Sequence, residues 1–327
     1  MPDLVCVTGA GGFIGGHLVR ALLDDGFEVR AVDKKPFDRW DQLHPEAENL
    51  GLDLQYLGQC RIAARDCDQV YNLAADMGGI GFIEKYKADC MLSVLISTHM
   101  LVAAEEVGIS RFFYSSSACA YAADHQTSTD VTALKEADAY PAMPEDGYGW
   151  EKLFSERMAR HFREDYGLQT RVARFHNVYG PNGEYQGGRE KAPAAISRKV
   201  ATAVLTGDHQ IDIWGDGEQR RSFMYIDDCL KGSRMIADGE FLDPINLGSA
   251  ELVSINELVS IVEEIAGIEL YRTYDLSAPQ GVRGRNSDNA LINDVFGWEP
   301  SVSLREGMAK TYAWVFEQVQ KDLKGSV

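Results

Sequence analysis

Hydrophobic positions in the first half of the chain fall into short runs separated by longer stretches with helical spacing. One such stretch, Phe13–Asp25, repeats apolar residues about every 3.6 positions, as a helix packed on a sheet does. Strands that alternate with helices are typical of βαβ units, which place parallel strands side by side. The runs predicted to form strands are Leu4–Thr8, Glu28–Val32, Val70–Leu73, Arg111–Ser115 and Gln169–Ala173.

The regular alternation weakens after about Arg174. A Gly- and Pro-rich stretch, 179–193, leads into a helix, and segments 223–229 and 244–248 look like short strands that return to the sheet. We therefore expect an α/β fold: a Rossmann-type doubly wound parallel sheet with a smaller, interleaved α/β substrate domain. The NAD-binding domain would comprise residues 1–175 plus about 222–250. The substrate domain would comprise about 176–221 plus 251–327.

Composition agrees with an ordinary soluble globular protein of about two domains. The chain has 327 residues, of which 45% are hydrophobic and 25% charged. Its first residues run directly into a strand without a basic segment or a small-residue cleavage site, and no apolar run approaches the ~18 residues that span a membrane. These features predict a cytoplasmic protein with no membrane partner.

Charge and cysteine usage narrow the class of partners. A formal net charge of -18 makes binding to nucleic acid or to anionic membranes unfavourable, because the summed field repels polyanions. The six cysteines show no C-x-x-C pair and no histidine at metal-ligand spacing, which predicts neither a disulfide framework nor a metal site. Most of them are expected to be small core residues.

A glycine-rich turn joins the first strand to the first helix. Gly9 can make the tight turn, Gly12 lets backbone N–H groups approach a pyrophosphate, and Gly15 allows close helix–strand packing. Asp33 ends the second strand, 18 residues past Gly15, where an acid can accept hydrogen bonds from ribose hydroxyls and repel a 2′-phosphate. This combination predicts NAD as the cofactor. Asp53 could contact adenine or be a solvated loop acid.

Tyr148 and Lys152 stand four residues apart at the start of a predicted helix, so that their side chains share one face. An ammonium near a phenol stabilises the phenolate and lowers the tyrosine pKa, which makes the tyrosine a usable general base. The pair follows a strand that ends in Ser115, Ser116 and Ser117, whose hydroxyls could orient a substrate alcohol at the carboxyl end of the sheet.

These motifs, with the segment Asn72–Ala75, resemble the extended short-chain dehydrogenase/reductase family, the NAD-dependent epimerases and dehydratases. The resemblance implies that Tyr148 is the base, that Lys152 lowers its pKa and holds the nicotinamide ribose, and that Ser117 polarises the reacting oxygen. It places the cofactor against Gly9, Gly12, Phe13, Ile14, Gly15, Asp33, Asp53, Leu73, Ala74, Ala75, Tyr148 and Lys152.

Longer strings resemble one group within this family, the GDP-mannose 3,5-epimerases. They include NLAADMGGIGFI, SSSACAY, RFHNVYGPNGEYQGGREKAPAA, WGDGEQRRSF and GVRGRNSDN. The resemblance implies a GDP-sugar substrate whose C4 is oxidised by tightly bound NAD, whose C5 and C3 are inverted, and whose C4 is then reduced. The products would be GDP-L-galactose, GDP-L-gulose or both, and the enzyme would be a homodimer.

A 4-keto sugar has acidic protons at C3 and C5, and inversion needs one group to remove a proton and another to deliver it to the opposite face. The resemblance offers Cys119 and Lys191 as this pair. The alternatives are a buried core cysteine for Cys119, and a solvated or phosphate-binding lysine for Lys191.

The resemblance also carries over a set of substrate-binding positions. Gly78 and Gly79 would form a loop that approaches the sugar closely, and Lys199, Arg221 and Arg283 suit a diphosphate. His176 and Tyr179 could lie in the core or behind the site. The full substrate set is Gly78, Gly79, Ser117, Asn177, Glu190, Lys191, Ala192, Lys199, Gln219, Arg221 and Arg283.

Departures from the plant-type pattern leave the exact sugar and base open. Arg220 stands where that pattern has a threonine. A nucleotide-sugar 4,6-dehydratase is an alternative, although such enzymes need an Asp-Glu pair where this chain has Ala118 and Cys119. A 4-epimerase would need no Cys119/Lys191 pair. A nonenzymatic NAD-sensing protein would not need both Tyr148 and Lys152.

Overall fold

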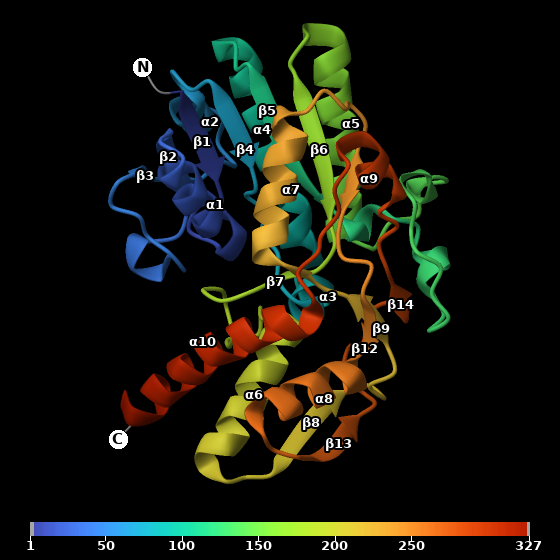
Figure 1. The fold of residues 1–327 in the computed structure, drawn as a ribbon. Coiled ribbons are helices and arrows are strands. Elements are labelled where there is room, and N and C mark those ends of the chain that lie inside the picture. The colour runs from blue at the N-terminus through green and yellow to red at the C-terminus, as the bar shows by residue number, and fades with distance from the viewer. Residues whose placement is uncertain (1–2, 326–327) are drawn as a thin grey trace.

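The computed structural model describes residues 3–325 and is built on a seven-stranded parallel sheet in the order β11-β6-β5-β4-β1-β2-β3 (Figure 1). The strand order reverses between β1 and β4, and such a switch point leaves a crevice beyond the carboxyl ends of the strands. The sheet comprises β1 (Leu4–Thr8), β2 (Glu28–Asp33), β3 (Glu48–Gly51), β4 (Gln69–Asn72), β5 (Arg111–Ser117), β6 (Thr170–Phe175) and β11 (Ile245–Leu247).

Helices cover both faces of this sheet because neighbouring residues of each strand point to opposite sides. Val5 and Val7 belong to the core beneath α1 (Phe13–Asp24) and α7 (Ile226–Asp238), whereas Cys6 between them belongs to the core on the other face. That second face is covered by α2 (Leu57–Ala64), α4 (Lys87–Val107) and α5 (Tyr148–Tyr166). The predicted doubly wound α/β fold is therefore confirmed.

A smaller α/β region lies beyond the carboxyl ends of the strands (Figure 1). There α6 and α8 pack together, and α10 crosses both of them. The domain boundaries given above stay a prediction. The elements of this region are α6 (Ala192–Thr206), β8 (Gln210–Trp214), α8 (Ile255–Ala266), β13 (Tyr271–Asp275), α10 (Leu304–Gly325) and a three-stranded sheet of β9 (Arg220–Ser222), β12 (Leu252–Ser254) and β14 (Gly284–Arg285).

The other regular elements are short. They are α3 (Ile80–Lys85), α9 (Ala290–Phe296), the paired strands β7 (Val178–Tyr179) and β10 (Met224–Tyr225), and the 3-10 helices Phe37–Arg39, Ala118–Ala120, Ala123–Gln126 and Glu136–Ala139.

The predicted strands and the first helix form, with ends that differ by at most two residues. Segment 244–248 contains β11, which pairs with β6 as expected. The prediction that segment 223–229 forms a strand of the large sheet is wrong. Its strand β10 pairs with β7 in a separate two-stranded sheet, and the chain turns into α7 at Ile226.

Helix α4 bears on the expectation that no apolar run in this chain is long enough to span a membrane. It is long and apolar enough to cross a membrane by length and composition alone, although the sequence showed no unbroken apolar run of that size. In the fold it packs between α2 and α5 and buries Ile96, Met100 and Leu101 against the sheet. These contacts make it a core helix of the larger region.

The cysteines are all free thiols with buried side chains. Among residues 3–325, no three His, Cys, Asp or Glu side chains cluster as metal ligands would.

Candidate active site

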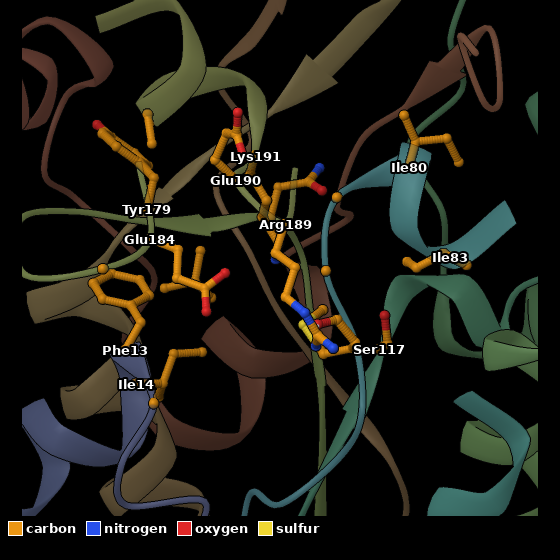
Figure 2. A pocket seen from close by; sticks show the side chains of 18 of the residues that line it. Phe13, Ile14, Ile80, Ile83, Ser117, Tyr179, Glu184, Arg189, Glu190 and Lys191 are labelled. Carbon is orange, nitrogen blue, oxygen red and sulfur yellow. The ribbon is translucent and has the colours of Figure 1, made fainter. Parts of the chain in front are cut away.

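A large cavity of about 1130 Å³ lies between the carboxyl ends of the sheet and the smaller region. Pockets of this size at a topological switch point are typical of nucleotide-binding α/β proteins. Figure 2 shows Phe13 and Ile14 on one side of it and Ile80 and Ile83 on the other, with Arg189 between. The predicted site residues that line it are Gly9, Gly12, Phe13, Ile14, Gly15, Asp33, Asp53, Leu73, Ala74, Ala75, Gly78, Gly79, Ser117, Cys119, Tyr148, Lys152, Asn177, Glu190, Lys191, Ala192, Lys199, Gln219 and Arg221.

The glycine loop forms a cradle that side chains would fill. Gly9 has a φ of 71°, and a Cβ there would lie 3.0 Å from the backbone nitrogen of Ala74. A Cβ on Gly15 would lie 2.2 Å from the carbonyl oxygen of Gly9. Helix α1 begins directly after Gly12, so its free N–H groups face the loop. This cradle fits the pyrophosphate of NAD, which is negatively charged and needs close backbone approach.

Asp33 is held at the end of β2 by backbone donors. Its Oδ2 accepts a hydrogen bond from Gly11 N at 3.1 Å and its Oδ1 accepts one from Lys35 N at 2.9 Å. The neighbouring ammonium groups are occupied by carboxylates, since Lys34 lies 3.3 Å from Asp76 and Lys35 lies 3.9 Å from Asp41. Asp33 therefore remains the acid whose carboxylate can accept hydrogen bonds from a cofactor ribose. This property suits NAD.

Tyr148 and Lys152 lie in the first turns of α5 and are both buried. The Lys152 ammonium donates to the carbonyl oxygen of Ser115 at 3.0 Å and lies 3.6 Å from a Glu151 carboxylate oxygen. It also lies 5.4 Å from the centre of the Tyr148 ring. The pair is thus brought together as predicted.

The pKa of Tyr148 differs from the sequence expectation. Burial raises this pKa well above its ordinary value, the charges of Cys119 and Glu151 add to the rise, and a hydrogen bond with Ser117 opposes it. The Lys152 ammonium itself contacts the Ser115 carbonyl oxygen and a Glu151 carboxylate oxygen. The raised pKa keeps Tyr148 a neutral phenol in the free protein, so that it must lose its own proton before it can act as a base.

Cys119 follows the end of β5 in a 3-10 turn, where its backbone N–H donates to Ser117 Oγ at 3.2 Å. Its side chain is buried and lines the cavity. The sulfur lies 3.6 Å from Nη1 of Arg285, a residue on β14 that sequence reasoning did not select. Cys119 is therefore neither an isolated core cysteine nor exposed, and its sulfur touches a cation.

Lys191 caps the N-terminus of α6 on the opposite side of the cavity from the sheet. Burial lowers its pKa from the usual lysine range, and the nearby charge of Cys119 raises it. Among residues 3–325, the ammonium has no hydrogen-bond or ion-pair partner. An unpartnered buried amine facing the cavity is suited to proton transfer or to an anionic ligand.

The predicted cationic residues divide into two kinds. Burial lowers the pKa of Arg221 to about 10, and within the described residues this guanidinium bonds only to the carbonyl oxygens of Arg220, Gln280 and Val282. A buried cation without a carboxylate fits an anionic group such as a diphosphate. Lys199, by contrast, already donates to Asp212 Oδ2 at 2.8 Å.

Arg283 is the predicted site residue that the cavity lining does not include. Both of its terminal nitrogens lie 3.0 Å from the two carboxylate oxygens of Asp216. Its binding to substrate stays a prediction, and it would require this ion pair to open. Arg285, two residues on, lines the cavity instead, and its guanidinium also pairs with Glu145.

Two loops meet over the cavity. A Cβ on Gly79 would lie 2.5 Å from the carbonyl oxygen of Glu190, which explains why this loop needs glycine. Arg189 was also missed by sequence reasoning: it donates to Asp76 Oδ1 at 2.9 Å and lies 3.7 Å from the centre of the Phe82 ring. The loop that carries Glu190 and Lys191 is thereby fixed to the segment after β4.

The remaining predicted residues take supporting positions. Asn177 has a φ of 40° and donates to the carbonyl oxygen of Ser222 at 3.0 Å, which joins β7 to β9. Gln219 donates to the carbonyl oxygen of Trp214 at 2.9 Å. His176 is fully buried and contacts Asn246, so it lies in the core, whereas Tyr179 lines the cavity.

The fold, the glycine cradle and the Tyr148/Lys152 pair are those of an NAD-dependent enzyme. Comparison with known proteins confirms this class. Residues 5–248 match the model of the NAD dependent epimerase/dehydratase family, and the chain belongs to this family. It is 44% identical over 325 residues to the GDP-mannose 3,5-epimerase of Arabidopsis thaliana, covering 98% of this chain and 85% of that one. A GDP-mannose 3,5-epimerase 1 of Oryza sativa subsp. japonica is also 44% identical, over 97% of this chain and 83% of its own.

Solved structures share the fold. MoeE5 in complex with UDP-glucose and NAD superposes with a TM-score of 0.78 at 28% identity, covering 97% of this chain and 99% of that chain. The UDP-glucose 4-epimerase of Thermotoga maritima has a TM-score of 0.85 at 24% identity, with 97% and 99% covered. The family makes the chain an NAD-dependent enzyme, and the solved structures show that it shares its fold with proteins that bind UDP-glucose.

Proposed function

We propose that this chain inverts C3 and C5 of GDP-mannose through a transient 4-keto intermediate, to give GDP-L-galactose, GDP-L-gulose or both. The observation that carries this proposal is the placement of Cys119 and Lys191 on different elements around one cavity, beside Tyr148. The 44% identity to GDP-mannose 3,5-epimerases over nearly the whole chain supports the same reaction.

The chain's own residues can carry each proton. NAD, held by the glycine cradle and Asp33, supplies hydride transfer at C4. Tyr148 first releases its phenolic proton to solvent, and the phenolate oxygen then takes the proton of the C4 hydroxyl and returns it at the end, while Ser117 orients the C4 oxygen. A ketone at C4 acidifies the C–H bonds at C3 and C5. One of Cys119 Sγ and Lys191 Nζ removes the proton, and the other delivers one to the opposite face.

The binding half of the site agrees with this substrate. Arg221 offers a buried cation to a diphosphate, and the Gly78–Gly79 loop lets a sugar approach the backbone closely. A 4,6-dehydratase is less well supported, because Ala118 and Cys119 follow Ser117 where acidic groups would be needed. A simple 4-epimerase is also less well supported, because its reaction would use neither Cys119 nor Lys191.

Incubation of the NAD-loaded enzyme with GDP-mannose in D2O tests this proposal. Deuterium should appear at C3 and C5 of the recovered sugar by NMR, while C1, C2 and C6 keep their protium and serve as internal controls. A 4-epimerase would place no solvent deuterium on carbon, and a 4,6-dehydratase would release water. Deuterium at neither C3 nor C5 would overturn the proposed function.

A homodimer through α4 and α5 belongs to the same proposal. Met91, Leu92 and Leu95 on α4 and Trp150 and Phe154 on α5 are exposed apolar side chains on two adjoining helices. Apolar patches of this kind mark protein interfaces. The Phe154→Glu variant should run as a monomer in light scattering, whereas Tyr166→Glu, farther along α5, should remain a dimer. A dimer in both variants would contradict this interface.

A cytoplasmic location stays a prediction.

A further inference from the structure

Segment 180–190, which we call the strap, connects β7 to α6 along the cavity. Near its start, Nε2 of His17 on α1 donates to the carbonyl oxygen of Pro181 at 2.9 Å. A Cβ on Gly183 would lie 3.0 Å from the ring of Phe13, the first residue of α1. The strap therefore packs directly against the helix whose N-terminus faces the glycine cradle.

Two lysines directly after β2 pair with acids from other parts of the chain. Nζ of Lys35 lies 3.9 Å from Oε1 of Glu184 in the strap, and it donates to the carbonyl oxygen of Gly11 at 3.3 Å. Nζ of Lys34 lies 3.3 Å from Oδ2 of Asp76, in the segment after β4. The end of β2 is therefore joined by ion pairs both to the strap and to the segment after β4.

Asp76 closes these contacts into a ring. Its other carboxylate oxygen, Oδ1, accepts a hydrogen bond at 2.9 Å from Nη1 of Arg189, near the far end of the strap. Ion pairs thus lead from the end of β2 to the strap and from the strap through Asp76 back to the end of β2. All of these charged side chains line the cavity. Figure 2 shows that Glu184 and Arg189 extend from the strap into the cavity, with Glu184 near Phe13 and Ile14.

Tyr185 fixes the strap to α10 on its other side. The Tyr185 hydroxyl donates to Oδ2 of Asp322 at 2.7 Å, and its ring meets the Trp314 ring edge-on with 5.6 Å between their centres. Nε of Arg198 donates to the carbonyl oxygen of Tyr185 at 2.9 Å. The residue next to Glu184 is therefore held by α6 and α10, so that the strap is braced as well as latched.

We infer that this ring of ion pairs retains NAD, and that the Lys35–Glu184 pair is the latch that opens when the cofactor leaves. A crevice at a switch point is open on its outer side, and the strap covers the part of it next to the start of α1. Asp41 also lies 3.9 Å from the Lys35 ammonium, but it belongs to the same loop as Lys35 and spans no opening. The inference concerns the cofactor alone and does not depend on which sugar is bound.

Release of radiolabelled NAD from the loaded enzyme tests the latch without any sugar. The enzyme is diluted into excess unlabelled NAD, and the label that stays bound is followed by rapid filtration. Glu184→Gln should release the label about two- to fivefold faster, the usual effect of losing a partly exposed ion pair. Glu46→Gln is the matched control, because it removes the same charge from an ion pair with Arg20 outside the cavity lining. It should release NAD at the unmodified rate.

A Lys35→Met variant, alone and combined with Glu184→Gln, shows whether the two residues act together. If they form one latch, Glu184→Gln should add no further acceleration once Lys35 is replaced, because the pair is already broken. An unchanged release rate in Glu184→Gln, or the same acceleration by Glu184→Gln with and without Lys35, would overturn the inference. Neither result bears on the epimerase proposal, which is tested by deuterium exchange into the sugar.

Discussion

Arg285 Nη1 lies 3.6 Å from Cys119 Sγ, although the two residues are 166 positions apart in the chain. Arg285 is itself fixed by two further partners, since its Nε donates to Gln126 Oε1 at 2.6 Å and its guanidinium pairs with Glu145. The sulfur is therefore oriented by a buried, immobile cation that can stabilise negative charge formed on it during proton transfer.

Replacement of Arg285 should slow proton exchange and spare hydride transfer. The Arg285→Met variant is expected to exchange deuterium into GDP-mannose about 10²-fold more slowly, the usual effect of losing one preorganised donor. Reduction of bound NAD by substrate, read from nicotinamide absorbance, should persist. Arg272→Met is the matched control, because Arg272 pairs with Glu263 outside the cavity lining. Equal losses in both variants would argue against a specific contact with Cys119.

Removal of the Cys119 thiol should separate the two halves of the reaction. In Cys119→Ala, exchange at C3 and C5 is expected to fall about 10²- to 10⁴-fold, because a general acid or base is lost. Partial reduction of bound NAD should remain, since Tyr148 and Lys152 are unchanged. Cys90→Ala provides the control, as Cys90 packs in the same hydrophobic cluster but does not line the cavity. Full exchange in Cys119→Ala would remove Cys119 from its proposed role.

The parts of the site that the sequence predicted are those encoded locally. Gly9, Gly12 and Gly15 occupy one turn, and Tyr148 and Lys152 occupy adjacent helical turns, so spacing alone places them together. Arg285 could not be selected in this way. The string GVRGRNSDN contains two arginines, and which one faces Cys119 depends on how β14 pairs with β9.

Short strands in the second half escaped prediction for a related reason. β10 has two residues, and its partner β7 lies 46 positions earlier, so that no periodicity in either segment reports the pairing. The Lys199–Asp212 ion pair likewise depends on how α6 packs on β8, and no local pattern indicates that Lys199 pairs with an acid instead of a diphosphate.

A buried ion pair supports the serine-rich end of β5. Arg174 donates to both carboxylate oxygens of Glu156, at 2.9 and 2.7 Å, and Ser116 donates to the same carboxylate. Glu156→Gln leaves the guanidinium buried without a counter-charge, which should lower the free energy of unfolding by about 3–5 kcal/mol in urea titrations. Glu164→Gln, in an exposed ion pair on the same helix, should change it little. Equal free energies of unfolding of the two variants would show that the buried pair does not contribute this stability.

His176 should make the fold less stable in mild acid. Burial lowers its pKa to about 4, and the charge of Arg174 acts in the same direction, whereas the hydrogen bond with Asn246 opposes it. An unfolded histidine has a pKa of about 6.5, so below that pH the unfolded chain binds a proton that the folded chain does not. This residue's share of the stability is therefore complete above about pH 6.5 and lost at up to about 1.4 kcal/mol per pH unit on the way down to about 4.

Urea titrations at several pH values between these limits measure that loss. His176→Gln has no titrating ring and should flatten the dependence by the stated slope, even if it is less stable overall. His161→Gln removes an exposed histidine on α5 and should leave the slope nearly unchanged. An identical slope in the unmodified protein and His176→Gln would mean that His176 takes up a proton in the folded state, which its burial against Asn246 and Arg174 argues against.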